Sequence, residues 1–158
     1  MRCMPASPIP EVMRFWNHPP HTKRLQSERA VRNLIDCTPS YYRFWAVADA
    51  KTDHCLGMVN YHDGHIRNKR VAIGLLHQPH PAAAGLAGEA VRAMLDFCFG
   101  ELALHRVQAF IHPDNTASRG LAEKLGFRCE GVLRHNLRVG EEWRDDMLYA
   151  LLATERGS

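Results

Sequence analysis

The chain has 158 residues, a formal net charge of +3 at pH 7, and 46% hydrophobic and 23% charged residues. This length suits one hydrophobic core, and we expect a single domain over residues 1–158. No apolar run approaches the roughly 20 residues that a membrane span needs, and the scattered basic residues do not indicate a nucleic-acid groove. The five cysteines are odd in number and widely spaced, which favours a reduced, cytoplasmic setting.

The first part of the chain predicts helix and then strands. Residues 11–35 are polar and partly helical, with a break at Pro19-Pro20. Three segments that follow are rich in β-forming residues and are joined by short polar turns: Phe44 to Asp49, Cys55 to His62 and Arg70 to Leu76. Such short turns predict an antiparallel meander.

After Gly85 the apolar residues recur at intervals of three and four. From Ala87 to Leu102 this period predicts an amphipathic helix of about four turns. A strand is expected over residues 105–111, followed by a short helix that Asn115 caps and Gly126 ends. Residues 128–134 and 146–152 predict two final strands around the polar turn VGEEW.

This order of elements predicts the fold class α/β, with a mixed sheet flanked by helices. A strand–helix–strand step of this length implies one parallel pair of strands inside the sheet. Because ligands bind outside the carboxyl ends of such strands, we expect a ligand in an opening between them.

Three motifs follow one another along the chain: IGLLHQPHPAAAGLAGEAV, HRVQAFIHPDNTASRGLAEKLGF, and EGVLR with EEWRDDMLYALL. In this order and spacing, residues 44–152 resemble the GCN5-related N-acetyltransferase (GNAT) family, and most of all its branch that acetylates ribosomal-protein N-termini. The resemblance implies a splayed mixed sheet and direct transfer of acetyl from the co-substrate acetyl-CoA. The acceptor would be a primary amine, on a protein N-terminus or a small molecule. A homodimer stays open.

The chain departs from the family pattern at two places. Only a short piece precedes EVMRFW, so the family's first strand has no clear counterpart. The phosphate loop has Ala82 where the family has glutamine or arginine, followed by Gly85 and Ala87 at the small positions. Since main-chain amides at a helix N-terminus already favour an anion, we expect this loop to hold phosphate without the missing side chain.

The resemblance also implies which residues bind the cofactor. The edge of the third strand would hydrogen-bond the pantetheine arm, Asn115 would lie beside that arm, and the loop with the start of the helix would hold the pyrophosphate. The residues are Leu75, Leu76, His77, Ala84, Gly85, Leu86, Ala87, Gly88 and Asn115. Two plainer interpretations remain: Gly85 and Gly88 could serve helix packing alone, and Asn115 could serve as a cap alone.

Ser118 is the candidate catalytic residue. The resemblance places it near the thioester sulfur, where its hydroxyl would protonate the departing thiolate. Many relatives use a tyrosine further along this helix, where the present chain has Ala122. A surface serine without a catalytic role is the alternative.

The general base and the presence of activity stay open in the sequence. Residues 71–73 carry no acid where some relatives have a glutamate, which leaves His62, His77 or solvent to take the proton from the amine. The missing carboxylate also keeps open a second class of function, a CoA-binding module without catalysis. His77 and His80 lack an accompanying metal motif, so we expect no metal site.

Overall fold

The computed structural model describes residues 13–17, 22–35, 42–77 and 85–156. Its strands form one mixed sheet of six, in the order β1-β2-β3-β4-β6-β5. The strands are β1 (Arg43–Ala48), β2 (Cys55–His65), β3 (Arg70–His77), β4 (Arg106–Ile111), β5 (Arg128–Val139) and β6 (Glu142–Leu152). The helices are α2 (Arg24–Ile35), α3 (Leu86–Asp96) and α4 (Thr116–Lys124), with a π-helical turn η2 (Phe97–Glu101) and a 3-10 turn η3 (Ala153–Glu155). The predicted α/β class with a mixed sheet is confirmed.

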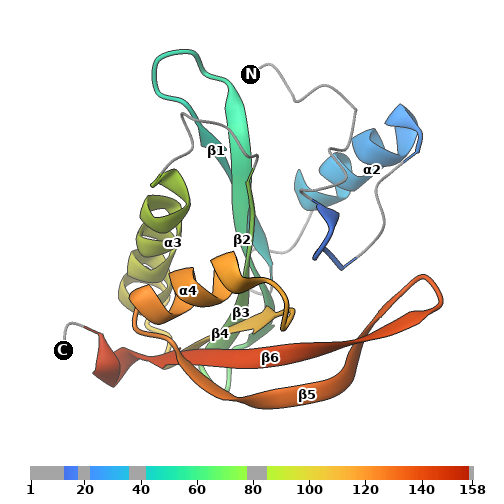
Figure 1. Ribbon diagram of the computed structural model, residues 1–158. Coiled ribbons are helices and arrows are strands. Elements are labelled where there is room, and N and C mark those ends of the chain that lie inside the picture. Colours follow the sequence, from blue (N-terminus) through green and yellow to red (C-terminus); the bar gives the residue numbers. More distant parts are fainter. Residues whose placement is uncertain (1–12, 18–21, 36–41, 78–84, 157–158) are drawn as a thin grey trace.

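The first three strands form the predicted antiparallel meander. In the described part of the chain no strand precedes Arg43. Figure 1 shows α3 and α2 on opposite sides of this part of the sheet. None of the described helices is long and apolar enough to cross a membrane.

The parallel pair β3–β4 is short, and the two strands then part. Its partners are Arg70 with Arg106, Val71 with Val107, and Ala72 with Gln108. Beyond these pairs β3 stays bonded to β2 as far as His77, while β4 stays bonded to β6 as far as Ile111. The sheet therefore opens at the carboxyl ends of β3 and β4, as the sequence predicted (Figure 1).

The hydrophobic core lies between the sheet and α3. The predicted apolar stripe of this helix is confirmed, since Val91, Met94 and Leu95 are buried against Val59 and Tyr61 of β2. Because strand side chains alternate, the residues between those two core positions face the other side of the sheet. The stripe continues into η2, so the predicted single helix ends in a π-helical turn rather than in regular α-helix.

The end of α4 follows the predicted pattern. Gly126 has φ +89°, its amide donates to the Glu123 carbonyl at 3.0 Å, and the Phe127 amide donates to the Ala122 carbonyl at 3.0 Å. Phe127 is buried, and it supplies the apolar contact that accompanies a helix end of this type. The buried Tyr149 of β6 donates its hydroxyl hydrogen to Glu123 at 2.9 Å and so fixes α4 to the sheet.

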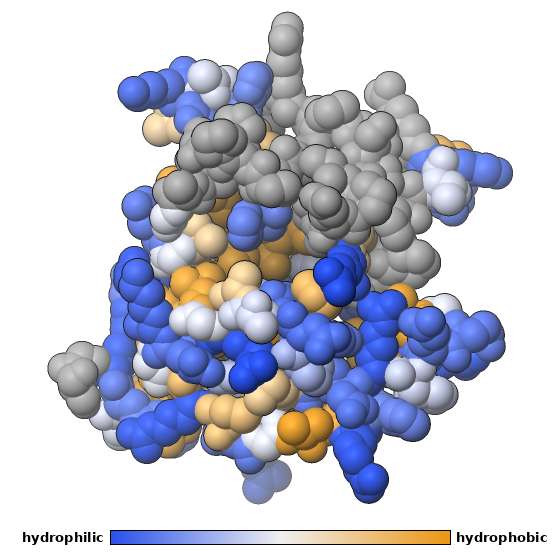
Figure 2. Space-filling view, viewed as in Figure 1, coloured by the Kyte–Doolittle hydropathy of each residue, from blue (hydrophilic) through white to orange (hydrophobic). Residues whose placement is uncertain are grey.

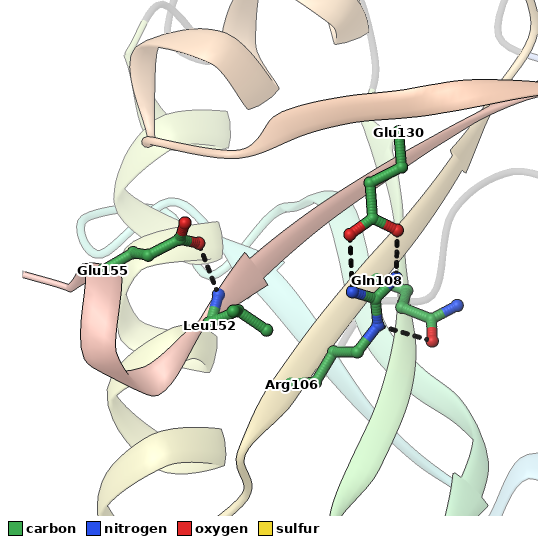
Figure 3. Close-up of polar contacts among 5 residues, drawn as sticks. All are labelled: Arg106, Gln108, Glu130, Leu152 and Glu155. Carbon is green, nitrogen blue, oxygen red and sulfur yellow. Dashed lines mark hydrogen bonds and ion pairs between the residues drawn. The ribbon is translucent and has the colours of Figure 1, made fainter.

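The β5–β6 hairpin is longer than predicted. The strands continue to Val139 and from Glu142, so that the turn narrows to Gly140 and Glu141. Its middle contains a bulge between Leu133 and Leu137, where the chain passes through a positive φ. At its base Arg106 of β4 forms a two-pronged ion pair with Glu130, shown in Figure 3.

Candidate active site

A cavity of about 380 Å³ lies where β3 ends, between the start of α3 and the first turns of α4. Its lining comes from these three elements: Leu75, His77, Gly85, Ala87, Gly88, Glu89, Arg92, Ala117, Ser118, Leu121 and Lys124. It adjoins the carboxyl end of β3, beside the point where the parallel strands part. In sheets of this kind that position is where ligands bind.

The structure brings most of the expected site residues to this one cavity. Leu75, His77, Gly85, Ala87, Gly88 and Ser118 all line it. Leu76, Leu86 and Asn115 are absent from the lining; Leu76 lies on the opposite face of β3 from its neighbours, because strand side chains alternate. Ala82 and Ala84, at the expected phosphate loop, lie outside the described residues.

The N-terminus of α3 has features that favour a nearby anion. Gly85 is the N-cap residue, in the left-handed region at φ 86°, and no side chain caps the helix there. Among the described residues, the first backbone bond in this helix runs from the Glu89 amide to the Gly85 carbonyl at 3.2 Å, and the amides of residues 86–88 bond to none of them. Such amides and the helix dipole favour negative charge.

Two cationic side chains in the lining were not predicted as site residues. Arg92 reaches the cavity from α3 and Lys124 from α4, while Glu89 brings one negative charge. Arg92 lies one turn after Gly88, a spacing that could have indicated a basic residue on the same helix face. A Cβ at Gly88 would lie 3.6 Å from both Arg92 and Leu121, so both neighbours already lie within ordinary contact distance of this glycine.

Asn115 and Ser118 together form the start of α4. The Asn115 Oδ1 accepts a hydrogen bond from the Ser118 amide at 3.1 Å, which confirms the predicted cap. This bond fixes the main chain of Ser118, whose residue lines the cavity. The capping role does not test a contact between Asn115 and a ligand.

The opposite face of the sheet carries polar side chains that the sequence did not single out together. Asn60 of β2 is 4% exposed, and among the described residues its Oδ1 has no hydrogen-bond partner. Nδ1 of His62, on the same strand and face, is likewise buried without a partner in the described chain. The sequence could have indicated this buried polar residue, because Asn60 lies inside a predicted strand and is preceded and followed by apolar residues.

Further along this face Asp146 of β6 is also buried. Its carboxylate accepts a hydrogen bond from the Asn136 side-chain amide at 2.9 Å. The neighbouring Asp145 accepts a bond from the His135 amide at 2.8 Å, within the bulge of β5. The bulge therefore has two acidic partners, which hold it against β6.

No three His, Cys, Asp or Glu side chains converge as a metal site anywhere in the described ranges. His80, which we weighed with His77 as a metal ligand, lies outside those ranges.

The opened mixed sheet and the helix start beside the opening match the arrangement that the sequence resemblance implies. A model of the acetyltransferase (GNAT) domain family matches residues 8–128. The chain therefore belongs to the GNAT acetyltransferase family, whose members use acetyl-CoA as the acetyl donor.

Three curated bacterial proteins illustrate the relationship. The chain is 41% identical over 68 residues to the probable N-acetyltransferase YjcK of Bacillus subtilis, a match that covers 43% of this chain but only 38% of that relative's length. It is 28% identical to the uncharacterized N-acetyltransferase p20 of Bacillus licheniformis, over 92% of this chain and 83% of the relative. A putative ribosomal N-acetyltransferase of Bacillus subtilis, YdaF, is 31% identical over 63% of this chain and 54% of its own.

A solved structure confirms the fold. The spermidine N-acetyltransferase from Vibrio cholerae, crystallised in complex with CoA and spermine, superposes with a TM-score of 0.79 over 93% of this chain and 85% of that chain. The two sequences are 20% identical, so this likeness concerns the fold.

Proposed function

We propose that the protein is an acetyl-CoA-dependent N-acetyltransferase that transfers acetyl directly to a primary amine. The observation that carries the proposal is the cavity at the start of α3, beside the parting of β3 and β4. The cavity combines the main-chain amides of a helix start, two cationic side chains and an apolar wall, which suits a ligand with a phosphate end and an uncharged arm.

Different residues of the chain would bind different parts of acetyl-CoA. The amides of residues 86–88 and the guanidinium of Arg92 would hold the pyrophosphate, because these are the donors nearest the dipole at the helix start. In the described part of the chain β3 pairs with β4 only as far as Ala72, and the main-chain groups of Leu75 and Leu76 on that side would bond the pantetheine arm. Acetyl-CoA supplies the activated acetyl group.

Ser118 is proposed as the acid that protonates the leaving thiolate. Its backbone is fixed by the Asn115 cap, and its residue faces the same cavity as the end of β3. A hydroxyl held in this way can donate its hydrogen as negative charge develops on the sulfur. The acceptor is proposed to be an aliphatic amine or a protein N-terminus, the two classes that the names of the relatives suggest.

Two measurements test this function. Acetyl-CoA should raise the melting temperature by mass action, and CoA release should appear when polyamines or N-terminal peptides are added, with the products weighed by mass spectrometry. A catalytically inactive CoA-binding module would show the thermal shift without acetylated product. Absence of any shift at millimolar acetyl-CoA would overturn both functions.

Ser118→Ala should lower turnover by roughly 10²-fold or more and leave acetyl-CoA affinity unchanged. Thr116→Ala removes an exposed hydroxyl from the same helical turn, outside the cavity lining, and serves as the matched control. Equal rates for both variants would return Ser118 to the role of a surface serine.

A further inference from the structure

The strand β2 presents two polar side chains on the face of the sheet away from α3. Val59 and Tyr61 belong to the core beneath α3, so the alternating residues Asn60 and His62 face the other side. The two are neighbours on that face. Asn60 is almost completely buried, and His62 is half-buried.

Both residues leave a buried hydrogen-bond acceptor without a partner. In the part of the chain that the structure describes, neither Asn60 Oδ1 nor His62 Nδ1 receives a hydrogen bond. A buried polar atom in this state costs about 1–3 kcal/mol, and native proteins contain few of them. Two such atoms on one face of one strand offer acceptors that a bound molecule can use.

The register places this pair at the opening of the sheet. His62 lies opposite Ala72, the last residue of β3 that pairs with β4, and Asn60 lies opposite Gly74, just beyond the parting. A Cβ at Gly74 would lie only 2.4 Å from Asn60 Oδ1. The Asn60 amide therefore extends over β3 toward the opening, in space that any other residue at position 74 would fill.

Polar groups consequently flank the opening on both faces of the sheet. The cavity with Ser118 lies on the side of α3 and α4, while Asn60 and His62 lie on the opposite face, the side of α2 in Figure 1. Figure 2 shows apolar surface near the middle of this view, with hydrophilic residues at its sides and below it. Each side of the opening thus has its own set of donors and acceptors.

We propose that Asn60 and His62 receive the acceptor amine, with Asn60 Oδ1 accepting one N–H bond and His62 Nδ1 taking the proton that the nitrogen loses. This assignment rests on the N-acetyltransferase function proposed above. It also supplies the base that β3 lacks, because His62 lies directly across from Ala72 in the segment that carries no acid.

The proposed step accounts for every bond and proton. The amine nitrogen forms a bond to the carbonyl carbon of the thioester, and the bond from that carbon to sulfur breaks. One N–H proton passes to His62 Nδ1 on one face, and the sulfur leaves as a thiolate that takes a proton from Ser118 on the other. His62 then returns its proton to solvent, and Ser118 regains one.

The charge around His62 suits a proton acceptor. Burial lowers the pKa of His62, while the negative charge of Asp63 acts in the opposite direction. On the neighbouring strands β1 presents Phe44 to this face and β3 presents Arg70, while Arg106 of β4 is neutralised by Glu130 (Figure 3). A lowered pKa widens the pH range in which His62 is neutral, and Nδ1 can then accept a proton when Nε2 carries the hydrogen.

The test compares His62→Gln and Asn60→Ala with the native chain, using His65→Gln as the matched control. His65 lies on the same strand but is exposed, and its Nδ1 already accepts the Asn68 amide at 3.2 Å. Each variant is checked by circular dichroism and by calorimetric titration with acetyl-CoA, and its rate is measured between pH 5.5 and about 9 with the best amine of the panel.

We expect His62→Gln to lose roughly 10²-fold or more in turnover, and to lose the rise in rate that the native enzyme shows as His62 deprotonates below its ordinary pKa. Asn60→Ala should lose roughly tenfold in kcat/KM for the amine. Both should bind acetyl-CoA as the native protein does, and His65→Gln should match it in every measurement.

The outcomes separate this assignment from the proposed function. If the native protein neither binds acetyl-CoA nor acetylates any amine, the N-acetyltransferase function is wrong and the assignment falls with it. If the native protein is active and folded His62→Gln keeps its rate within threefold and its native pH profile, the function stands and the assignment is overturned. If His62→Gln does not fold, His62→Asn at the same position decides in the same way.

Discussion

Replacing Gly85 tests the anion-binding helix start most directly. A Cβ at this residue would meet no described atom within 4 Å, so an added methyl group clashes with none of the described residues. The difficulty is the backbone, since φ is +86° and a residue with a Cβ loses about 1–2 kcal/mol in the left-handed region. If Gly85→Ala relaxes away from this conformation, ligand binding must restore it, and CoA affinity should fall by about tenfold.

The assay combines urea unfolding with calorimetric titration of CoA. Gly120→Ala is the matched control, because Gly120 also has open space around it but lies inside α4 without a positive φ. That change should raise the unfolding free energy by about 0.5–1 kcal/mol and leave CoA binding unchanged. Gly85→Asn is the second comparison, since asparagine enters the left-handed region more readily than alanine.

The three variants distinguish an effect of the backbone conformation at residue 85 from an effect of the added side chain. Asparagine should retain more CoA affinity than alanine if the backbone conformation is what matters. Equal and severe losses in both would mean that the ligand needs the bare Cα itself. Native stability and native affinity in Gly85→Ala would refute the argument from φ altogether.

Three further changes have expected outcomes. Asn115→Ala removes the cap on the Ser118 amide and should cost about 0.5–2 kcal/mol in urea unfolding, whereas Asn115→Asp should stay within a few tenths. Burial raises the pKa of Cys98 to about 12, so its contribution to stability is complete below the ordinary value of 9.0 and is lost as pH rises toward 12. The unfolding free energy should therefore fall more steeply above pH 9 in the native chain than in Cys98→Ala, and parallel curves would contradict this. Asn136→Ala leaves the buried Asp146 without its side-chain donor and should cost about 1–3 kcal/mol; a loss below 0.5 kcal/mol would mean that solvent replaces the amide.

Local periodicity predicted most of the fold because each element buries one face. The spacing of Val91, Met94 and Leu95 indicated α3, and the left-handed stop at Gly126 follows from a glycine placed before an apolar residue. The length of the β5–β6 hairpin was underestimated, because its outer half is exposed and carries polar residues on both faces. In such a strand the pairing is set by the partner strand and the tight turn, not by burial.

The residues of the candidate site were also predictable from the sequence only in part. Gly85 and Ser118 could be found because a motif fixes them relative to a helix start. Asn60 could not be assigned a role, because its burial depends on a register that places it against Gly74 of the neighbouring strand. Arg92 was missed for a similar reason, since only the packing of α3 beside α4 brings it to the cavity.

The short β3–β4 pairing has a mechanical consequence. The sheet consists in effect of two three-stranded halves, residues 43–77 and 106–152, which share a ladder only three residue pairs long. Few backbone bonds therefore fix the angle between the halves, and this angle is held mainly by the core, which contains residues of both. A molecule that lies in the opening and is hydrogen-bonded to both strands would link the two halves where β3 and β4 are not paired. The two halves would then move as one body.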